Sequence, residues 1–186
     1  MAIVNLNFQV TKPFGNLFRK NCVLIAVEDN DGNILIGTKP SFFPPTIARL
    51  LGGGVDEGED LYDAAIRELY EELNVRIEKS DMTELSTFIS DVTDEDNRTF
   101  HNVTTVYHVN IGKMSYRAGD DVKSILKLTK EELLQLGESY ENLSSELWYM
   151  GNEGNFSWAD YAKLYGPLHK IVAKELISLN NEYQSR

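Results

Sequence analysis

The chain has 186 residues, 42% hydrophobic and 25% charged, as is typical of globular proteins, so we expect one domain over 1–186. Its formal net charge of −11 disfavours nucleic-acid binding, because neutralising phosphates requires a surplus of Lys and Arg. There is no apolar run long enough to span a membrane and no recognisable signal peptide, and the only cysteine, Cys22, excludes a disulfide framework. These features predict a cytoplasmic protein without a membrane partner.

The first fifty residues are expected to form strands joined by turns. Residues 21–29 (NCVLIAVED) contain the apolar run CVLIAV, which is typical of a strand buried on both faces. The turn-forming residues 29–33 (DNDGN) separate this strand from 34–38, so 21–38 is predicted to be a hairpin. A proline-rich loop follows at 39–47. Further strands are expected at 3–10 and 48–51.

A glycine-rich loop then leads into an acidic amphipathic helix. The glycines of this loop are Gly52, Gly53, Gly54 and Gly58. A helix is predicted over 61–73, preceded by Asp60, because apolar residues recur there at three- and four-residue steps. Glu68, Glu71 and Glu72 stand at i, i+3 and i+4, so they project from one face beside the apolar stripe. Three such carboxylates repel one another unless a cation neutralises them, and Mg²⁺ prefers oxygen ligands of this kind.

Residues 53–75 resemble the Nudix box, written G-x5-E-x7-R-E-U-x-E-E-x-G-U with U an aliphatic residue. Every specified position matches except Asn74, which replaces the second glycine. Asparagine is the next most tolerant residue at a left-handed helix end, so this change is expected to spare the chemistry. The resemblance implies an α/β/α sandwich with a mixed sheet. It also implies a hydrolase that cleaves a pyrophosphate bond in a nucleoside-diphosphate-linked substrate.

The same resemblance implies roles for individual residues. The implied ligands of Mg²⁺ or Mn²⁺ are Glu68, Glu71, Glu72 and the carbonyl of Gly53. Arg67 and Glu59 are implied to position this metal shell. From spacing alone, Arg67 can pair with Glu71, four residues further along the helix, or place its guanidinium fork on Glu59 from the loop.

The second half of the chain continues the alternation of strands and helices. Strands are expected at 83–93, 102–111 and 122–128, separated by a turn at 94–98 and a loop at 112–121. Thr129 and Glu132 have the spacing of a capping box, which predicts a helix over 130–137. The order of strand pair, acidic helix, strand pair and later helix fits the sandwich that the resemblance implies.

Residues 155–180 are predicted to be a C-terminal pair of helices packed on the domain. Ser157 and Asp160 have N-cap and N3 spacing, while Gly166-Pro167 is expected to end one helix and begin the next. The apolar face of this tail favours packing on the core over binding of a partner protein.

Candidate substrate-binding residues lie outside the box. Lys39 follows the strand at 34–38 and Arg49 lies just before the glycine loop, so each can bind a phosphate or be an ordinary surface charge. Phe42 and Phe43, in the proline-rich loop, can stack on a nucleobase or simply pack as core or lid.

The resemblance implies that the base for the attacking water is a box glutamate or an acid from a distant loop. The loop candidates are Glu95, Asp120 and Asp121, although the aspartate pair is also consistent with a solvated turn. His101, His108 and His169 lack metal-ligand spacing, and no chemical role is assigned to them.

Two other functions stay open at this point. One is a catalytically silent module that binds a nucleotide for regulation. The other is an isoprenyl-diphosphate isomerase, which often requires a well-placed cysteine, and Cys22 in its apolar strand is a poor candidate. Nucleoside triphosphates, nucleotide sugars and other diphosphates all stay open as substrates, and a homodimer is possible because many Nudix proteins pair.

Overall fold

The computed structural model describes residues 1–39, 46–119, 122–151 and 154–184. In this part of the chain, seven strands form one mixed sheet in the order β1-β5-β6-β2-β4-β3-β7. The strands are β1 (Ala2–Val10), β2 (Asn21–Asp29), β3 (Ile34–Thr38), β4 (Arg49–Gly54), β5 (Met82–Asp94), β6 (Thr99–Gly112) and β7 (Ser124–Leu128). The helices are α1 (Leu61–Leu73), α2 (Lys130–Tyr140) and α3 (Trp158–Gln184), with 3-10 turns η1 (Gly15–Phe18) and η2 (Lys79–Asp81).

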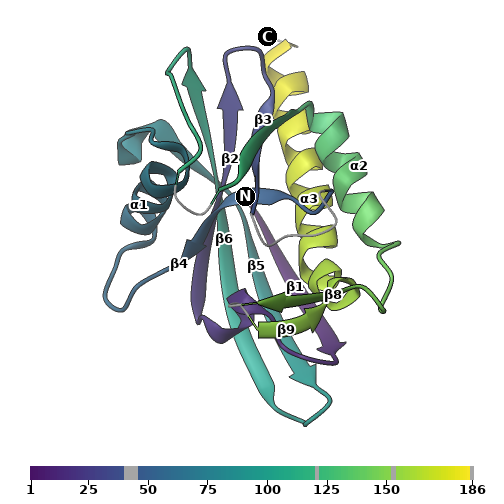
Figure 1. Ribbon diagram of the computed structural model, residues 1–186. Coiled ribbons are helices and arrows are strands. Elements are labelled where there is room, and N and C mark those ends of the chain that lie inside the picture. The colour runs from purple at the N-terminus through teal and green to yellow at the C-terminus, as the bar shows by residue number, and fades with distance from the viewer. Residues whose placement is uncertain (40–45, 120–121, 152–153, 185–186) are drawn as a thin grey trace.

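The elements form three layers, with α1 on one face of the sheet and α2 and α3 on the other (Figure 1). β2 runs parallel to β6 and antiparallel to β4, so the sheet is mixed and the predicted α/β/α sandwich is confirmed. Alternate residues of β2 enter two different apolar cores. Val23 and Ile25 pack with α1, whereas Leu24 packs with the α2 and α3 side. A strand buried on both faces needs apolar residues at nearly every position, which explains the sequence of β2.

Local capping sets the ends of α1 and the start of α2. The Asp60 carboxylate accepts a hydrogen bond from the Tyr62 N–H, and α1 ends at Asn74, whose φ of 57° is left-handed as predicted. Thr129 and Glu132 form the predicted capping box of α2, each side chain accepting from the other's backbone N–H.

The prediction of two C-terminal helices is wrong, because α3 is one continuous helix that contains Pro167. Gly166 does not end a helix; it lies where α3 packs closely against α2. A Cβ added to Gly137 of α2 would lie only 2.9 Å from the Gly166 carbonyl oxygen, so this crossing requires small residues. Residues 155–157, also predicted to be helical, belong instead to a small hairpin of β8 (Trp148–Gly151) and β9 (Gly154–Ser157).

Helices α2 and α3 both hold the segment at the start of β4. The Tyr140 hydroxyl of α2 donates to the Ala48 carbonyl oxygen and accepts from the Ala48 N–H. Nε2 of His169, on α3, accepts from the Leu50 N–H at 3.2 Å. Although α3 has 27 residues, no helix in the described ranges is apolar enough over a sufficient length to cross a bilayer.

His169 is expected to make the fold sensitive to acid. Its complete burial, together with the charge of Arg49, lowers its pKa from 6.5 to about 3. Because the unfolded chain takes up this proton first, the neutral histidine stabilises the fold above about pH 6.5, and this contribution is lost as the pH falls towards 3. In urea unfolding at pH 7, 6 and 5, the wild type should lose about 1 kcal/mol more per pH unit below 6.5 than His169→Gln. Parallel pH curves would contradict this assignment.

Candidate active site

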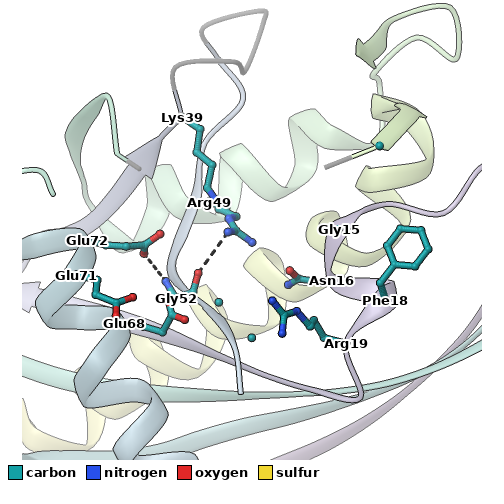
Figure 2. A pocket seen from close by; sticks show the side chains of 13 residues that line it. Gly15, Asn16, Phe18, Arg19, Lys39, Arg49, Gly52, Glu68, Glu71 and Glu72 are labelled. Carbon is teal, nitrogen blue, oxygen red and sulfur yellow. Dashed lines mark hydrogen bonds between the residues drawn. The ribbon is translucent and has the colours of Figure 1, made fainter. Parts of the chain in front are cut away.

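A cavity of about 790 Å³ lies between α1 and the segments around η1 and β4 (Figure 2). It is lined by Gly15, Asn16, Phe18, Arg19, Lys39, Arg49, Gly52, Gly53, Gly54, Glu68, Glu71, Glu72 and Gly154. The cavity therefore joins the glycine loop, the acidic face of α1 and the cationic side chains of Arg19, Lys39 and Arg49.

Glu68, Glu71 and Glu72 form an acidic wall of the cavity from one face of α1, as the helical spacing predicts. Glu72 is only 7% exposed, and its Oε2 accepts from the Gly52 N–H at 2.6 Å. Burial raises the pKa of Glu72, while the charge of Arg49 and the Gly52 hydrogen bond oppose that rise. The side chain of Glu71 is 56% exposed, so solvent exposure increases along the acidic wall from Glu72 to Glu71.

Arg67 ties this wall to the glycine loop. Its Nε and one terminal nitrogen each lie 2.9 Å from a different oxygen of Glu59, which is a two-point fork. The other terminal nitrogen donates to Glu68 at 2.8 Å and to Glu71 at 3.3 Å. The Arg67 guanidinium lowers the pKa of Glu59. In turn, the hydrogen bonds with Glu59 make the largest contribution to raising the pKa of Arg67, and the hydrogen bond with Glu68 raises it further. Sequence spacing left Glu59 and Glu71 open as alternatives, and Arg67 contacts both.

Two glycines let the backbone approach these carboxylates. Gly52 has a φ of 131°, and a Cβ there would lie 2.2 Å from the Val23 carbonyl oxygen of β2. A Cβ on Gly53 would lie 2.7 Å from Oε1 of Glu68. A side chain at Gly52 would therefore push β4 away from β2, whereas one at Gly53 would displace the Glu68 carboxylate.

The donor chemistry of the acidic wall fits a hard divalent cation. Carboxylate and carbonyl oxygens are the ligands that Mg²⁺ prefers. Within the described ranges, however, no three acidic, histidine or cysteine side chains converge as a ready-made metal cage. Arg67 instead contacts Glu68 and Glu71, and Glu72 is bonded to Gly52. Metal binding at this wall would therefore require Glu68 and Glu71 to exchange their contacts with Arg67 for contacts with the ion.

The opposite wall is cationic. Lys39 and Arg49, both predicted as substrate contacts, line the cavity. Arg49 is 7% exposed; one terminal nitrogen donates to the Tyr165 hydroxyl at 3.0 Å and the other to the Gly52 carbonyl at 3.3 Å. Asn16 also donates to the Tyr165 hydroxyl, so one residue of α3 orders two residues of the cavity.

Tyr165→Phe is expected to weaken both the fold and the site. Loss of the hydroxyl leaves Arg49 and Asn16 without a shared acceptor, which should lower the free energy of unfolding by about 1 to 3 kcal/mol. A less constrained Arg49 should also lower kcat/KM about tenfold. Urea unfolding and steady-state kinetics measure the two effects. Tyr70→Phe is the matched control, because Tyr70 lies outside the cavity with Arg76 stacked on its ring; equal effects of both variants would refute the prediction.

Four predicted residues lie outside the described part of the chain: Phe42, Phe43, Asp120 and Asp121. Gly119, which precedes the two aspartates, donates its N–H to the carbonyl oxygen of Glu72 at 2.8 Å. Glu95 does not line the cavity but lies in a separate surface depression, where it pairs with Lys12.

Five lining residues were not predicted from the sequence: Gly15, Asn16, Phe18, Arg19 and Gly154. None belongs to the box, and Gly154 belongs to the hairpin that was not predicted. Only the position of Arg19 could have indicated a place in the cavity, because Arg19 precedes β2. Strand β2 pairs with β4 (Arg49–Gly54), the glycine strand, where Cys22 lies opposite Gly54.

Comparisons with known proteins show what this chain is similar to. A family model described as NUDIX domain matches residues 18–144. RNA pyrophosphohydrolase from Bartonella quintana is 39% identical over 67 residues, covering 33% of this chain and 39% of that protein. The Bradyrhizobium protein of the same name is 40% identical over 61 residues, covering 31% and 36%. The chain thus matches less than half the length of these curated relatives.

Two solved structures show the same fold. An Ap4A hydrolase from C. elegans, solved as a binary complex, has a TM-score of 0.50 at 17% identity, covering 86% of this chain and 98% of that one. The dihydroneopterin triphosphate pyrophosphohydrolase of E. coli has a TM-score of 0.51 at 16% identity, covering 63% of this chain and 86% of that one.

Proposed function

The chain belongs to the Nudix family, and on that basis we propose that it is a metal-dependent hydrolase cleaving a pyrophosphate bond in a nucleoside-diphosphate-linked substrate. The observation that carries this proposal is the pairing of two walls of opposite charge in one cavity. Glu68, Glu71 and Glu72 form the acidic wall, and it faces Lys39 and Arg49 across the glycine strand (Figure 2).

The proposed role of each residue follows from its chemistry. Glu68, Glu71, Glu72 and the Gly53 carbonyl would hold Mg²⁺ or Mn²⁺. When bound, such an ion neutralises phosphate charge and lowers the pKa of a coordinated water. Arg67 holds the carboxylate wall against Glu59, which limits its movement while substrate binds. Lys39 and Arg49 bind phosphate oxygens through charge-assisted hydrogen bonds.

The base is proposed to be a box glutamate or one of Asp120 and Asp121. The backbone bond from Gly119 to Glu72 supports the aspartates as candidates, because it places their neighbour at the end of α1. An isoprenyl-diphosphate isomerase receives no support: Cys22 is fully buried, burial raises the pKa of its thiol, and it does not line the cavity.

A substrate panel with Mg²⁺, with Mn²⁺ and with a chelator tests this function. The panel contains a nucleoside triphosphate, a nucleotide sugar and a dinucleoside polyphosphate. It also contains an RNA with a 5′-triphosphate, because the curated relatives are named RNA pyrophosphohydrolases. Cleavage of at least one compound that stops with chelator supports the proposal. Binding of these compounds without cleavage would replace it with a silent nucleotide-binding module.

A further inference from the structure

One cation of the cavity has no partner within the described part of the chain. Arg19 directly follows η1, two residues before the start of β2, and its exposed side chain lines the cavity. Its Nε lies 3.1 Å from where a Cβ on Gly54 would stand, so the guanidinium lies against the glycine strand. No hydrogen bond or ion pair of this guanidinium with described residues exists. An arginine held against the backbone with an open fork is suited to bind an anion.

The place of Arg19 in the cavity separates it from the acidic wall. Figure 2 shows Glu68, Glu71 and Glu72 on one side of the glycine strand and Arg19 and Asn16 on the other, with Arg49 between the two groups. The hydrogen bonds of Arg49 to Tyr165 and Gly52 fix its position. Arg19 therefore extends the cationic wall beyond Arg49, away from the carboxylates.

This extension adds charge that a diphosphate does not require. A diphosphate linkage held at the acidic wall can reach the nearer cations, Lys39 and Arg49. Each further phosphate adds negative charge along the same chain and needs another cation to offset it. Among the described lining residues, the one aromatic ring belongs to Phe18, which is 60% exposed and packs edge-on against Phe100. A planar guanidinium at the far end of a polar cavity is thus better matched to phosphate than to an apolar group.

We propose that Arg19 binds a third phosphate, so that the preferred substrates carry a chain of three or more phosphates. This inference rests on the proposed function, since it places the scissile bond at the acidic wall. Arg19 acts as a specificity residue: it contacts substrate but takes no part in activating water.

Binding of inorganic tripolyphosphate and pyrophosphate, measured by calorimetry with Mg²⁺ present, tests this assignment. The wild type is expected to bind tripolyphosphate more tightly than pyrophosphate. Arg19→Gln should weaken tripolyphosphate binding about 10- to 100-fold, the range for hydrogen bonds between charged groups. Its effect on pyrophosphate should stay below about threefold, within the scatter of an uninvolved surface residue. Phosphate release is followed in parallel to verify that the ligands stay intact.

Two further variants test whether the positive charge of Arg19 or the two-point geometry of its guanidinium is responsible for the effect. Lys20→Gln is the matched control, because Lys20 is the neighbouring exposed cation and does not line the cavity. It should bind both ligands as the wild type does. Arg19→Lys keeps the charge but loses the two-point geometry, so it should fall between wild type and Arg19→Gln. Equal weakening of both ligands by Arg19→Gln, or no weakening, would overturn the proposal.

Failure of this inference and failure of the proposed function give different results. If no panel compound is cleaved but tripolyphosphate selectivity depends on Arg19, the phosphate site stands and the hydrolase proposal falls. If the enzyme cleaves a nucleotide sugar and Arg19→Gln changes neither its kcat/KM nor tripolyphosphate binding, the hydrolase stands and the third-phosphate site falls.

Discussion

Glu71→Gln is expected to reduce kcat about 10³-fold while leaving the fold intact. Glu71 is the most open carboxylate of the acidic wall, so it can reach a metal ion without disturbing the core. An amide is a weaker ligand and carries no charge, and loss of several kcal/mol of transition-state stabilisation corresponds to this fall in rate. Steady-state kinetics on the cleaved panel compound, with saturating Mg²⁺, measures the effect.

Glu72→Gln is expected to remove turnover to a similar extent and to affect stability differently. The amide oxygen can still accept from the Gly52 N–H, while a buried carboxylate that is costly to ionise disappears. The free energy of unfolding should therefore stay unchanged or rise. Glu57→Gln is the control for both variants, because Glu57 is exposed and does not line the cavity. Wild-type turnover in either box variant would remove that residue from the proposed metal shell.

Arg67→Lys is expected to lower kcat/KM about 10- to 100-fold, the usual range for residues that orient metal ligands. Lysine keeps the charge but cannot place a two-point fork on Glu59 while also reaching Glu68. The carboxylate wall would then sample positions that do not bind metal. Kinetics at increasing Mg²⁺ should show a higher metal requirement than in the wild type.

Glu59→Gln removes the other partner of the same fork, which makes a double-variant cycle informative. Because both changes break one contact, the loss in the double variant should be much smaller than the sum of the two single losses. Arg76→Lys is the control, since Arg76 stacks on Tyr70 outside the cavity. Additive losses would show that Arg67 and Glu59 act independently.

Elements with a strong local pattern could be predicted from the sequence to within a residue or two. The bounds of β2, β3 and α1 agree with the prediction because a buried apolar run, a turn of polar residues and a helical stripe each depend on neighbouring positions. The left-handed conformation of Asn74 is also local, since it follows from where the helix ends. For the same reason, the shared face of Glu68, Glu71 and Glu72 follows from spacing alone.

The C-terminal segment could not be predicted in the same way. Gly166-Pro167 carries the local signal of a helix break, yet α3 continues through it because its packing against Gly137 of α2 stabilises the longer helix. The strands β8 and β9 have four residues each, too few for any periodicity to show. Here packing between segments overrode or replaced the local pattern.

The sequence by itself determined the family resemblance, which implies the three-layer architecture, and the acidic wall, because the box and the helical spacing lie within short stretches of chain. Only the tertiary structure decided how Arg49 is held beside that wall and that Arg19 joins the cavity. Arg49 is bonded to Tyr165, 116 residues further along the chain, and Arg19 reaches the cavity because β2 pairs with the glycine strand. Such contacts depend on how distant segments pack, and no spacing within either segment encodes them.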